Sequence, residues 1–415
     1  MAVTFRDGRS KGAAMTSQVF PREEYEARWA KVHGEMARRG YETAVIWSRG
    51  ASSYDRCANL LWLVNHYSGH PGQTPDNNLW QGRGHNAVIM RAGREPELHN
   101  DELLEPADWL ATDNWHWHQN PIRGTADALN EQGITGPVAI VGTDFLPCKY
   151  MDWLREWCPR IDWCPEDDLV KSVQHVKSPR ELDVFREAGD IASRALTLIM
   201  EGLVSGQTEA EAAAAGAAEV VRRGGIPAVI RLSHGTGDEM NNFSRYPLSG
   251  ADPDSAPVEG DFVRGWIMGP MRHGYFLDPG RTAVCGRRPS NTQRELMEAC
   301  MGIVDGVMAK IRPGVSPHEL AREGDRLTRE AGGGDTVDQA GLQWPLYGHL
   351  CDMMFENPMY GLSTCDEDQL IQGNMVCSSE AFLAWEGVGA VGFEQNLIVH
   401  EDSVEVITTT PIHWE

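Results

Sequence analysis

The feature that most constrains this chain of 415 residues is a set of four acid and imidazole side chains in its last third. Asp278 lies in the segment 274–282, and the other three are His349, Glu380 and Glu394. Each lies in an apolar or glycine-rich stretch. Burying a carboxylate is costly unless a partner neutralises it, and a divalent cation is a common partner. The pattern therefore predicts a buried metal centre.

Composition narrows the class of protein. The 60 acidic and 37 basic side chains give a formal net charge of -23, which argues against nucleic acid and anionic membrane surfaces as partners. No apolar run approaches the roughly 18 residues that span a bilayer. The nine cysteines are scattered and odd in number, which is typical of reduced thiols. We therefore expect a cytoplasmic protein that acts on a small-molecule substrate.

The first 170 residues show strands that alternate with helices. A helix is expected over 23–39 and another near 126–132, and four apolar runs are expected to be strands: 43–47, 60–64, 87–90 and 137–141. This alternation predicts an α/β domain over residues 1–170.

From residue 171 to the end the pattern changes to helices against an antiparallel sheet. Ser178 is expected to cap a helix, with Pro179 in its first position and Glu181 completing a capping box. Further helices are expected over 208–223, 294–310 and 317–330, and strands over 228–232, 261–268, 375–379 and 396–400. We therefore predict an α+β domain over 171–415.

Together these landmarks resemble the pita-bread superfamily of methionine aminopeptidase, aminopeptidase P, prolidase and creatinase, over most of the chain. The start of the helix at 177–181 is similar to the family's K-S-x-x-E, and 274–282 is similar to its G-Y-x-x-D-x-x-R-T. The resemblance implies a creatinase-like α/β N-terminal domain, a pita-bread catalytic domain and a homodimer. It also implies the metal ligands, which would be Asp278, His349, Glu380 and Glu394.

Departures from the family pattern are equally informative. The family has a further metal-binding Asp eleven residues before the one matched by Asp278, and that position here is Ile267, flanked by Trp266 and Met268. Because that Asp binds only one of two metals, its loss weakens a two-metal site most. The remaining four positions predict a single divalent metal, namely iron, manganese or zinc. The alternative is no metal, as in creatinase.

Two histidines of the peptidases are also missing. Seven residues after His349 the chain has Glu356 in place of one His. A further His of the peptidases, several residues beyond a Ser-Gly turn, is matched by Asn241 or Asn242. Since those histidines help to bind and turn over the scissile peptide, their absence favours a non-peptidase. The sequence therefore predicts a hydrolase that cleaves a C–N bond in a small polar metabolite, with Glu356 and His349 as catalytic residues.

Other functions remain open. One is a metal-dependent lyase similar to dimethylsulfoniopropionate lyase, which Trp80 and the acid at Glu356 suggest. The others are a metal-free, creatinase-like amidinohydrolase and a catalytically silent binding protein.

Four residues are predicted to bind substrate. Trp344 and Tyr347 lie just before His349, on the segment that should line the site. His234 lies in a turn that matches the Ser-Gly turn of the peptidases. Trp80 could wall a pocket for a cationic or aromatic substrate, or could pack in a core.

Overall fold

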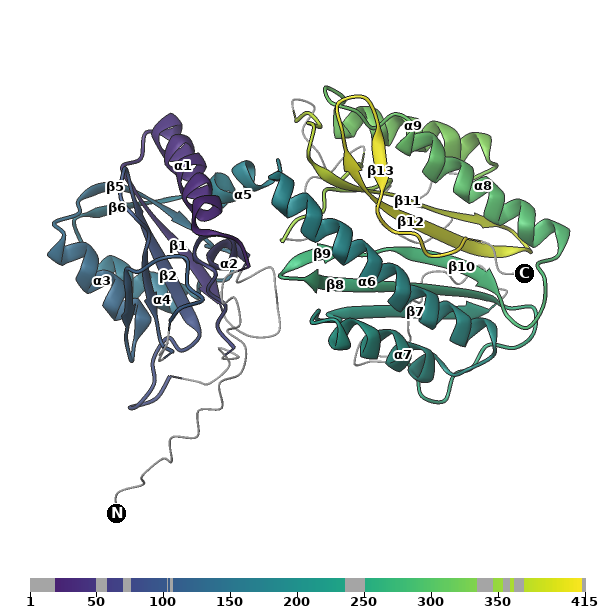
Figure 1. The fold of residues 1–415 in the computed structure, drawn as a ribbon, viewed down its shortest axis with the longest axis horizontal. Coiled ribbons are helices and arrows are strands. Elements are labelled where there is room, and N and C mark those ends of the chain that lie inside the picture. Colours follow the sequence, from purple (N-terminus) through teal and green to yellow (C-terminus); the bar gives the residue numbers. More distant parts are fainter. Residues whose placement is uncertain are drawn as a thin grey trace, which may run out of the picture. The chain divides into compact units, whose positions relative to one another are not determined.

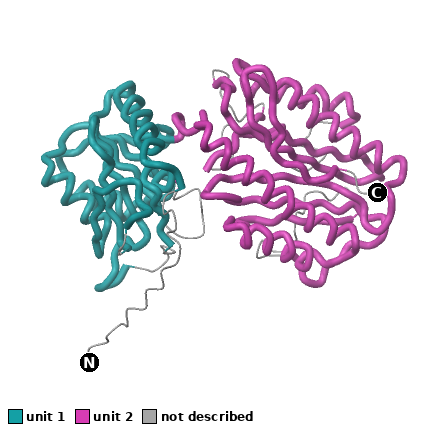
Figure 2. Tube along the Cα trace, in the orientation of Figure 1, with its two compact units in different colours: residues 1–51, 59–170 teal, residues 52–58, 171–415 magenta. Residues whose placement is uncertain are grey.

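A computed structural model describes residues 19–49, 58–69, 76–102, 104, 107–235, 251–333, 346–353, 359–361 and 369–412. The chain forms two compact units (Figure 2), and the division between Val170 and Lys171 falls within helix α5 (Asp168–Gln174).

The N-terminal unit is built on a six-stranded sheet in the order β4-β3-β2-β1-β5-β6. β1 is parallel to β5 and antiparallel to β2, so the sheet is mixed. The strands are β1 (Thr43–Arg49), β2 (His85–Arg91), β3 (Glu97–Asn100), β4 (Trp115–Trp117), β5 (Gly136–Val141) and β6 (Ile161–Pro165). The helices are α1 (Arg22–Arg39), α2 (Ala58–Val64), α3 (Pro121–Glu131) and α4 (Cys148–Trp157). These elements confirm the predicted α/β class of this part of the chain.

One predicted strand is wrong. The run 60–64 belongs to helix α2, not to a strand. Trp62 and Leu63 are both buried, so the run is apolar on every side and shows no periodicity that separates a short helix from a strand.

The C-terminal unit is built on an antiparallel sheet in the order β11-β12-β10-β8-β7, with β13 beside β12 and β9 beside β8 (Figure 1). The strands are β7 (Val229–Gly235), β8 (Phe262–Arg272), β9 (Tyr275–Leu277), β10 (Gly280–Val284), β11 (Val376–Trp385), β12 (Gly389–Val399) and β13 (Val404–Val406). The helices are α6 (Pro179–Val204), α7 (Glu209–Arg222), α8 (Asn291–Met308) and α9 (Pro317–Glu330). Helices on an antiparallel sheet confirm the predicted α+β class.

Local sequence explains where these four helices begin. Each starts with a complete capping box, in which a hydroxyl accepts from the third helical N–H while that residue's side chain accepts from the cap N–H. The pairs are Ser178 with Glu181, Thr208 with Glu211, Ser290 with Gln293 and Ser316 with Glu319. The box predicted at Ser178 is thus confirmed.

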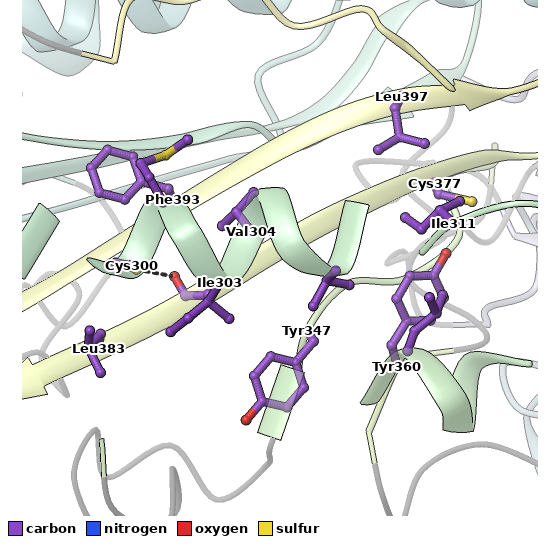
Figure 3. Close-up of a cluster of buried hydrophobic side chains, with 14 of the residues drawn as sticks. Cys300, Ile303, Val304, Ile311, Tyr347, Tyr360, Cys377, Leu383, Phe393 and Leu397 are labelled. Carbon is purple, nitrogen blue, oxygen red and sulfur yellow. Dashed lines mark hydrogen bonds between the residues drawn. The ribbon is translucent and has the colours of Figure 1, made fainter. Parts of the chain in front are cut away.

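Helices cover one face of the C-terminal sheet. α6 packs on β8, while α8 packs on β11 and β12. In the core beneath α8, Cys300 and Val304 lie near Phe393 of β12 (Figure 3). Since successive residues of a strand point to opposite faces, the alternate residues of β11 and β12 point to the other face. No helix in the described ranges is both long and apolar enough to cross a membrane.

The close packing of α6 against the backbone at Ile407 leads to a prediction about stability. A Cβ atom at Gly189 would lie 2.2 Å from the carbonyl oxygen of Ile407. We expect Gly189→Ala to lower the free energy of unfolding by about 1–3 kcal/mol, because a backbone atom must move. Gly302→Ala on α8 is the control: with no atom within 4 Å, it should be neutral or stabilising. Equal stability of the two variants in urea unfolding would contradict this packing.

Candidate metal centre

Strand register brings the acidic side chains into one row across the C-terminal sheet. Glu380 of β11 pairs with Glu394 of β12, which in turn pairs with Gly280 of β10. Gly280 also pairs with Trp266 of β8. Directly paired residues project to the same face, so one row contains two carboxylates, a glycine and an indole. Asp278 lies two residues before Gly280, so it is next to the row along the chain and not part of it.

His349 approaches this row from an irregular segment. Gly348 before it has φ +138°, and a Cβ atom there would lie 2.3 Å from the carbonyl oxygen of Ser378. Glycine therefore lets the segment pass against β11, where the N–H of His349 donates to the Ser378 hydroxyl at 3.1 Å and its carbonyl accepts from the Ser378 N–H at 2.7 Å. These bonds fix the imidazole beside the carboxylates.

Three carboxylates surround one nitrogen of His349. Its Nε2 lies 3.0 Å from Asp278 Oδ2, 3.3 Å from Glu394 Oε1 and 3.8 Å from Glu380 Oε1. All four residues are buried. Two overlapping groups have ligand atoms close enough to share a cation: His349 with Glu380 and Glu394, and Asp278 with His349 and Cys351.

The chemistry of these atoms fits a divalent metal. Asp278 Oδ2 and Glu394 Oε1 are sealed from solvent, and within the described residues neither accepts a hydrogen bond of good geometry, which is costly for anionic oxygens. Nδ1 of His349 lies 3.0 Å from the carbonyl oxygen of Leu350. A proton on Nδ1 leaves the Nε2 lone pair directed at the carboxylates, which is the tautomer of a metal ligand.

The same groups perturb one another's protonation. Burial and the charges of Asp278 and Glu380 raise the pKa of Glu394 well above its usual value. Burial alone would lower the pKa of His349, but the Asp278 carboxylate outweighs it and raises that pKa well above 6.5. Both shifts favour the protonated forms, so a cation that binds these groups must compete with protons.

Two hydrogen-bonded pairs hold the frame around this row. The buried ammonium of Lys177 lies 3.1 Å from Asp352, which fixes the chain just after His349. The Tyr275 hydroxyl donates to Glu181 at 2.7 Å, which ties the segment containing Asp278 to the start of α6. The motif at 177–181 therefore contacts the motif at 274–282, and this contact positions Asp278.

Trp266 extends the row onto β8, beside Arg231 of β7. Its indole N–H donates to Glu394 Oε2 at 2.9 Å. The ring lies across Gly280, because a Cβ atom there would fall 1.8 Å from the indole Cε2. It also stacks on Phe382, with ring centroids 5.4 Å apart. An aromatic ring therefore fills the place beside Glu394 where the row would otherwise continue.

The register corrects the residue expected at this place. Counting eleven residues back from Asp278 gives Ile267, but the residue in the row is Trp266. The β8–β9 hairpin has a bulge between Pro270 and Arg272, and this extra residue shifts the pairing by one. A shift of one residue reverses the face, so Ile267 points to the opposite side of the sheet.

Three predicted substrate-binding residues lie among the described residues. Trp80 belongs to the N-terminal unit, where the Arg83 guanidinium lies 3.9 Å from its ring centroid. Tyr347 is buried in the core beneath α8 and α9 (Figure 3). His234 precedes Gly235 on β7 and lies 3.3 Å from Asp261, not beside the carboxylate row. Within the C-terminal unit, the structure thus brings together the four predicted ligands but not the side chains of Tyr347 and His234.

The other predicted residues, Glu356, Trp344, Asn241 and Asn242, lie outside the described residues. Three residues of the site were not predicted from the sequence. Cys351 belongs to one of the two ligand groups, Asn396 donates to Asp278 Oδ1 at 2.9 Å, and Trp266 contacts Glu394. Asn396 and Glu394 are two apart on β12, which begins before the strand predicted over 396–400; with the longer strand, its period of two could have identified Asn396.

This fold and this row of ligands define a two-domain enzyme of the pita-bread type. The prolidase of Thermococcus sibiricus has the same fold, with a TM-score of 0.74 at 16% identity over 94% of this chain and 99% of that one. The model of metallopeptidase family M24 matches residues 183–401, more than half of the chain. The chain therefore belongs to family M24, whose activity is hydrolysis.

Curated relatives have two kinds of name. A probable dipeptidase PepE of Mycobacterium tuberculosis is 25% identical over 322 residues, which cover 74% of this chain and 75% of that protein. An ectoine hydrolase of Halomonas elongata is 26% identical over 338 residues, which cover 75% of each. The chain is thus similar both to dipeptidases and to a hydrolase with another named substrate.

The buried carboxylates predict stabilisation by a divalent cation. We expect Mn²⁺ to raise the melting temperature of the chelator-treated protein, because it binds the folded state selectively. The rise should be larger at pH 8 than at pH 6, since fewer protons then compete for Glu394 and His349. Glu380→Ala should abolish it, while Glu386→Ala, at an exposed position, should not. An equal rise in both variants would place the cation elsewhere.

Proposed function

We propose that the chain is a non-peptidase hydrolase that cleaves a C–N bond in a small polar metabolite with one divalent metal. Asp278, His349, Glu380 and Glu394 are the proposed ligands. Three carboxylates and one imidazole suit iron(II), manganese or zinc. A metal bound by these residues would acidify a water molecule and polarise a substrate oxygen.

The observation that carries the proposal is the indole of Trp266 in the ligand row. A second metal would need a further ligand beside Glu394, and the ring fills that place. The indole N–H also engages Glu394 Oε2, so only Oε1 is directed at His349. A carboxylate whose second oxygen accepts a hydrogen bond is suited to bind one metal, not to bridge two.

The protein's own groups prepare the site for this chemistry. Asn396 donates to Asp278 Oδ1, so Oδ2 remains directed at His349 Nε2. The Leu350 carbonyl oxygen orients the imidazole, and Trp266 orients Glu394. Each ligand is thus held by a neighbour, which keeps its donor atom in place. The role of Glu356 as a catalytic general base or acid remains a prediction, as does the homodimer.

The relatives support hydrolysis and leave the substrate class open between peptides and other metabolites. The probable dipeptidase and the ectoine hydrolase cover similar shares of the chain at similar identity. Trp266 favours the second class, because it removes the site of a two-metal peptidase.

Metal stoichiometry tests the role of Trp266. Elemental analysis should find about one metal per chain in the wild type. Trp266→Asp replaces the ring with a carboxylate, and we expect it to raise the metal content towards two. Trp266→Phe is the matched control, because it keeps most of the ring volume, loses the N–H and should leave the content at one. Two metals in the wild type would refute the single-metal proposal.

Isotope incorporation tests the reaction class. With ectoine and an Ala-Pro dipeptide as first probes in ¹⁸O-labelled water, we expect turnover of the non-peptide alone. Its product should gain one labelled oxygen, since hydrolysis inserts solvent oxygen. Turnover of Ala-Pro would contradict the non-peptidase assignment, and an unlabelled product would favour the lyase.

A further inference from the structure

A buried arginine lies on the same face of the sheet as the ligand row. Arg264 precedes Trp266 by two residues on β8, so both side chains project to one face. The other face is covered by α6, since a Cβ atom at the intervening Gly265 would meet Met200 at 2.9 Å and Ile199 at 3.2 Å. The side chain of Arg264 therefore starts one step along β8 from the indole.

Two of its three nitrogens are fixed by neighbouring strands. Nε donates to the Ser233 hydroxyl of β7 at 2.8 Å, and Nη1 donates to the carbonyl oxygen of Ala390 on β12 at 2.7 Å. These bonds reach strands on both sides of β10, so the guanidinium is held across the face of the sheet. Its orientation is set before any ligand arrives.

The third nitrogen remains available. Within the described residues, Nη2 of Arg264 makes no hydrogen bond and is not sealed from solvent, and no carboxylate forms an ion pair with the guanidinium. Arg281, also buried, differs: its Nε, Nη1 and Nη2 donate to Thr410, to Gly280 and Glu394, and to Gln395. Arg281 is satisfied by the fold, whereas Arg264 has one donor left over.

A buried guanidinium such as that of Arg264 destabilises the fold when no counter-ion is bound to it. Only 1% of Arg264 is exposed, and burial lowers its pKa to about 10, so the side chain is still charged at neutral pH. The charges of Asp261 and Glu209 act in the opposite direction and raise this pKa, but neither carboxylate forms an ion pair with the guanidinium. A buried charge that lacks a partner is destabilising unless a ligand supplies one. The whole chain has a net charge of -23, which repels anions at long range, so an anionic ligand needs a local cation of this kind.

We propose that Arg264 binds a carboxylate group of the substrate through Nη2, and thereby sets the substrate class as small carboxylates. The guanidinium reaches Ala390, four residues before Glu394 on β12, so we expect the substrate carboxylate to lie on the order of 10 Å from the ligand row. The stacked rings of Trp266 and Phe382 flank the row and would contact the apolar part of such a molecule. This inference rests on the proposed function only in making the ligand a substrate.

Binding to the metal-free protein tests the inference separately from catalysis. The probes are N-acetylglycine and N-acetylglycinamide, which differ only in carboxylate against carboxamide, titrated by calorimetry after EDTA treatment. We expect the wild type to bind the carboxylate at least about tenfold more tightly, since a hydrogen bond to a charged group is the stronger one. Because no metal is required, this result is independent of whether hydrolysis is later observed.

Substitutions show which residue is responsible for the preference for the carboxylate probe. Arg264→Gln should remove the preference for the carboxylate, and Arg264→Lys should keep only part of it. The matched control is Arg231→Gln: Arg231 pairs with Trp266 on the same face but is exposed, and its loss should leave the preference unchanged. If Arg264→Gln does not fold by circular dichroism, Ser233→Ala replaces it, and loss of the Nε acceptor should weaken the preference.

Three outcomes would overturn the inference. The first is a wild type that binds both probes equally. The second is a preference that survives in folded Arg264→Gln or, where Ser233→Ala stands in for it, is unchanged in that variant. The third is a preference that disappears in Arg231→Gln, which would place the anion on the exposed arginine.

Discussion

The C-terminal unit depends on one electrostatic constraint: three carboxylates share its interior with a single imidazole. Asp278, Glu380 and Glu394 lie within 3.8 Å of His349 Nε2, and all are buried. Such a group is unfavourable unless protons or a cation balance it. The surrounding structure holds it together nonetheless, through cross-strand pairing, the Tyr275–Glu181 hydrogen bond and the capping box at the start of α6. Other contacts in the fold thus offset the unfavourable free energy of burying these groups together.

Trp266 gives this site its particular character. The Trp266 ring fills the space beside Glu394, and its indole N–H donates a hydrogen bond to one of the two carboxylate oxygens of Glu394. Both effects support the single metal proposed for this site. Arg264 lies on the same strand and face, and it adds a positive charge where the rest of the row is acidic. A strand of eleven residues thus contributes both a steric limit and an anion partner to one face.

Much of this arrangement follows from sequence, and the exceptions have physical causes. The fold class and the helix starts were predictable because capping boxes and apolar periodicity act locally. The four ligands came from motif order, and the structure brings them together. The strand predicted over 60–64 was wrong because an apolar segment that is buried on all sides shows no hydrophobic periodicity. Trp266 was overlooked because counting residues assumes an unbulged hairpin, and a bulge is set by pairing between strands. Arg264 gave no signal, since a strand arginine reveals neither its burial nor its unused donor.

The bulge at Pro270–Arg272 also bears on how such a centre could change during evolution. Because one extra residue decides which side chain of β8 enters the row, an insertion or deletion in the turn can exchange an indole for an aliphatic side chain there. No ligand has to mutate. Hairpin length is usually regarded as a neutral variable at the periphery of a fold. Under the single-metal proposal, hairpin length here decides which side chain lies beside Glu394, so we expect relatives with the same four ligands to differ in the number of metals they hold.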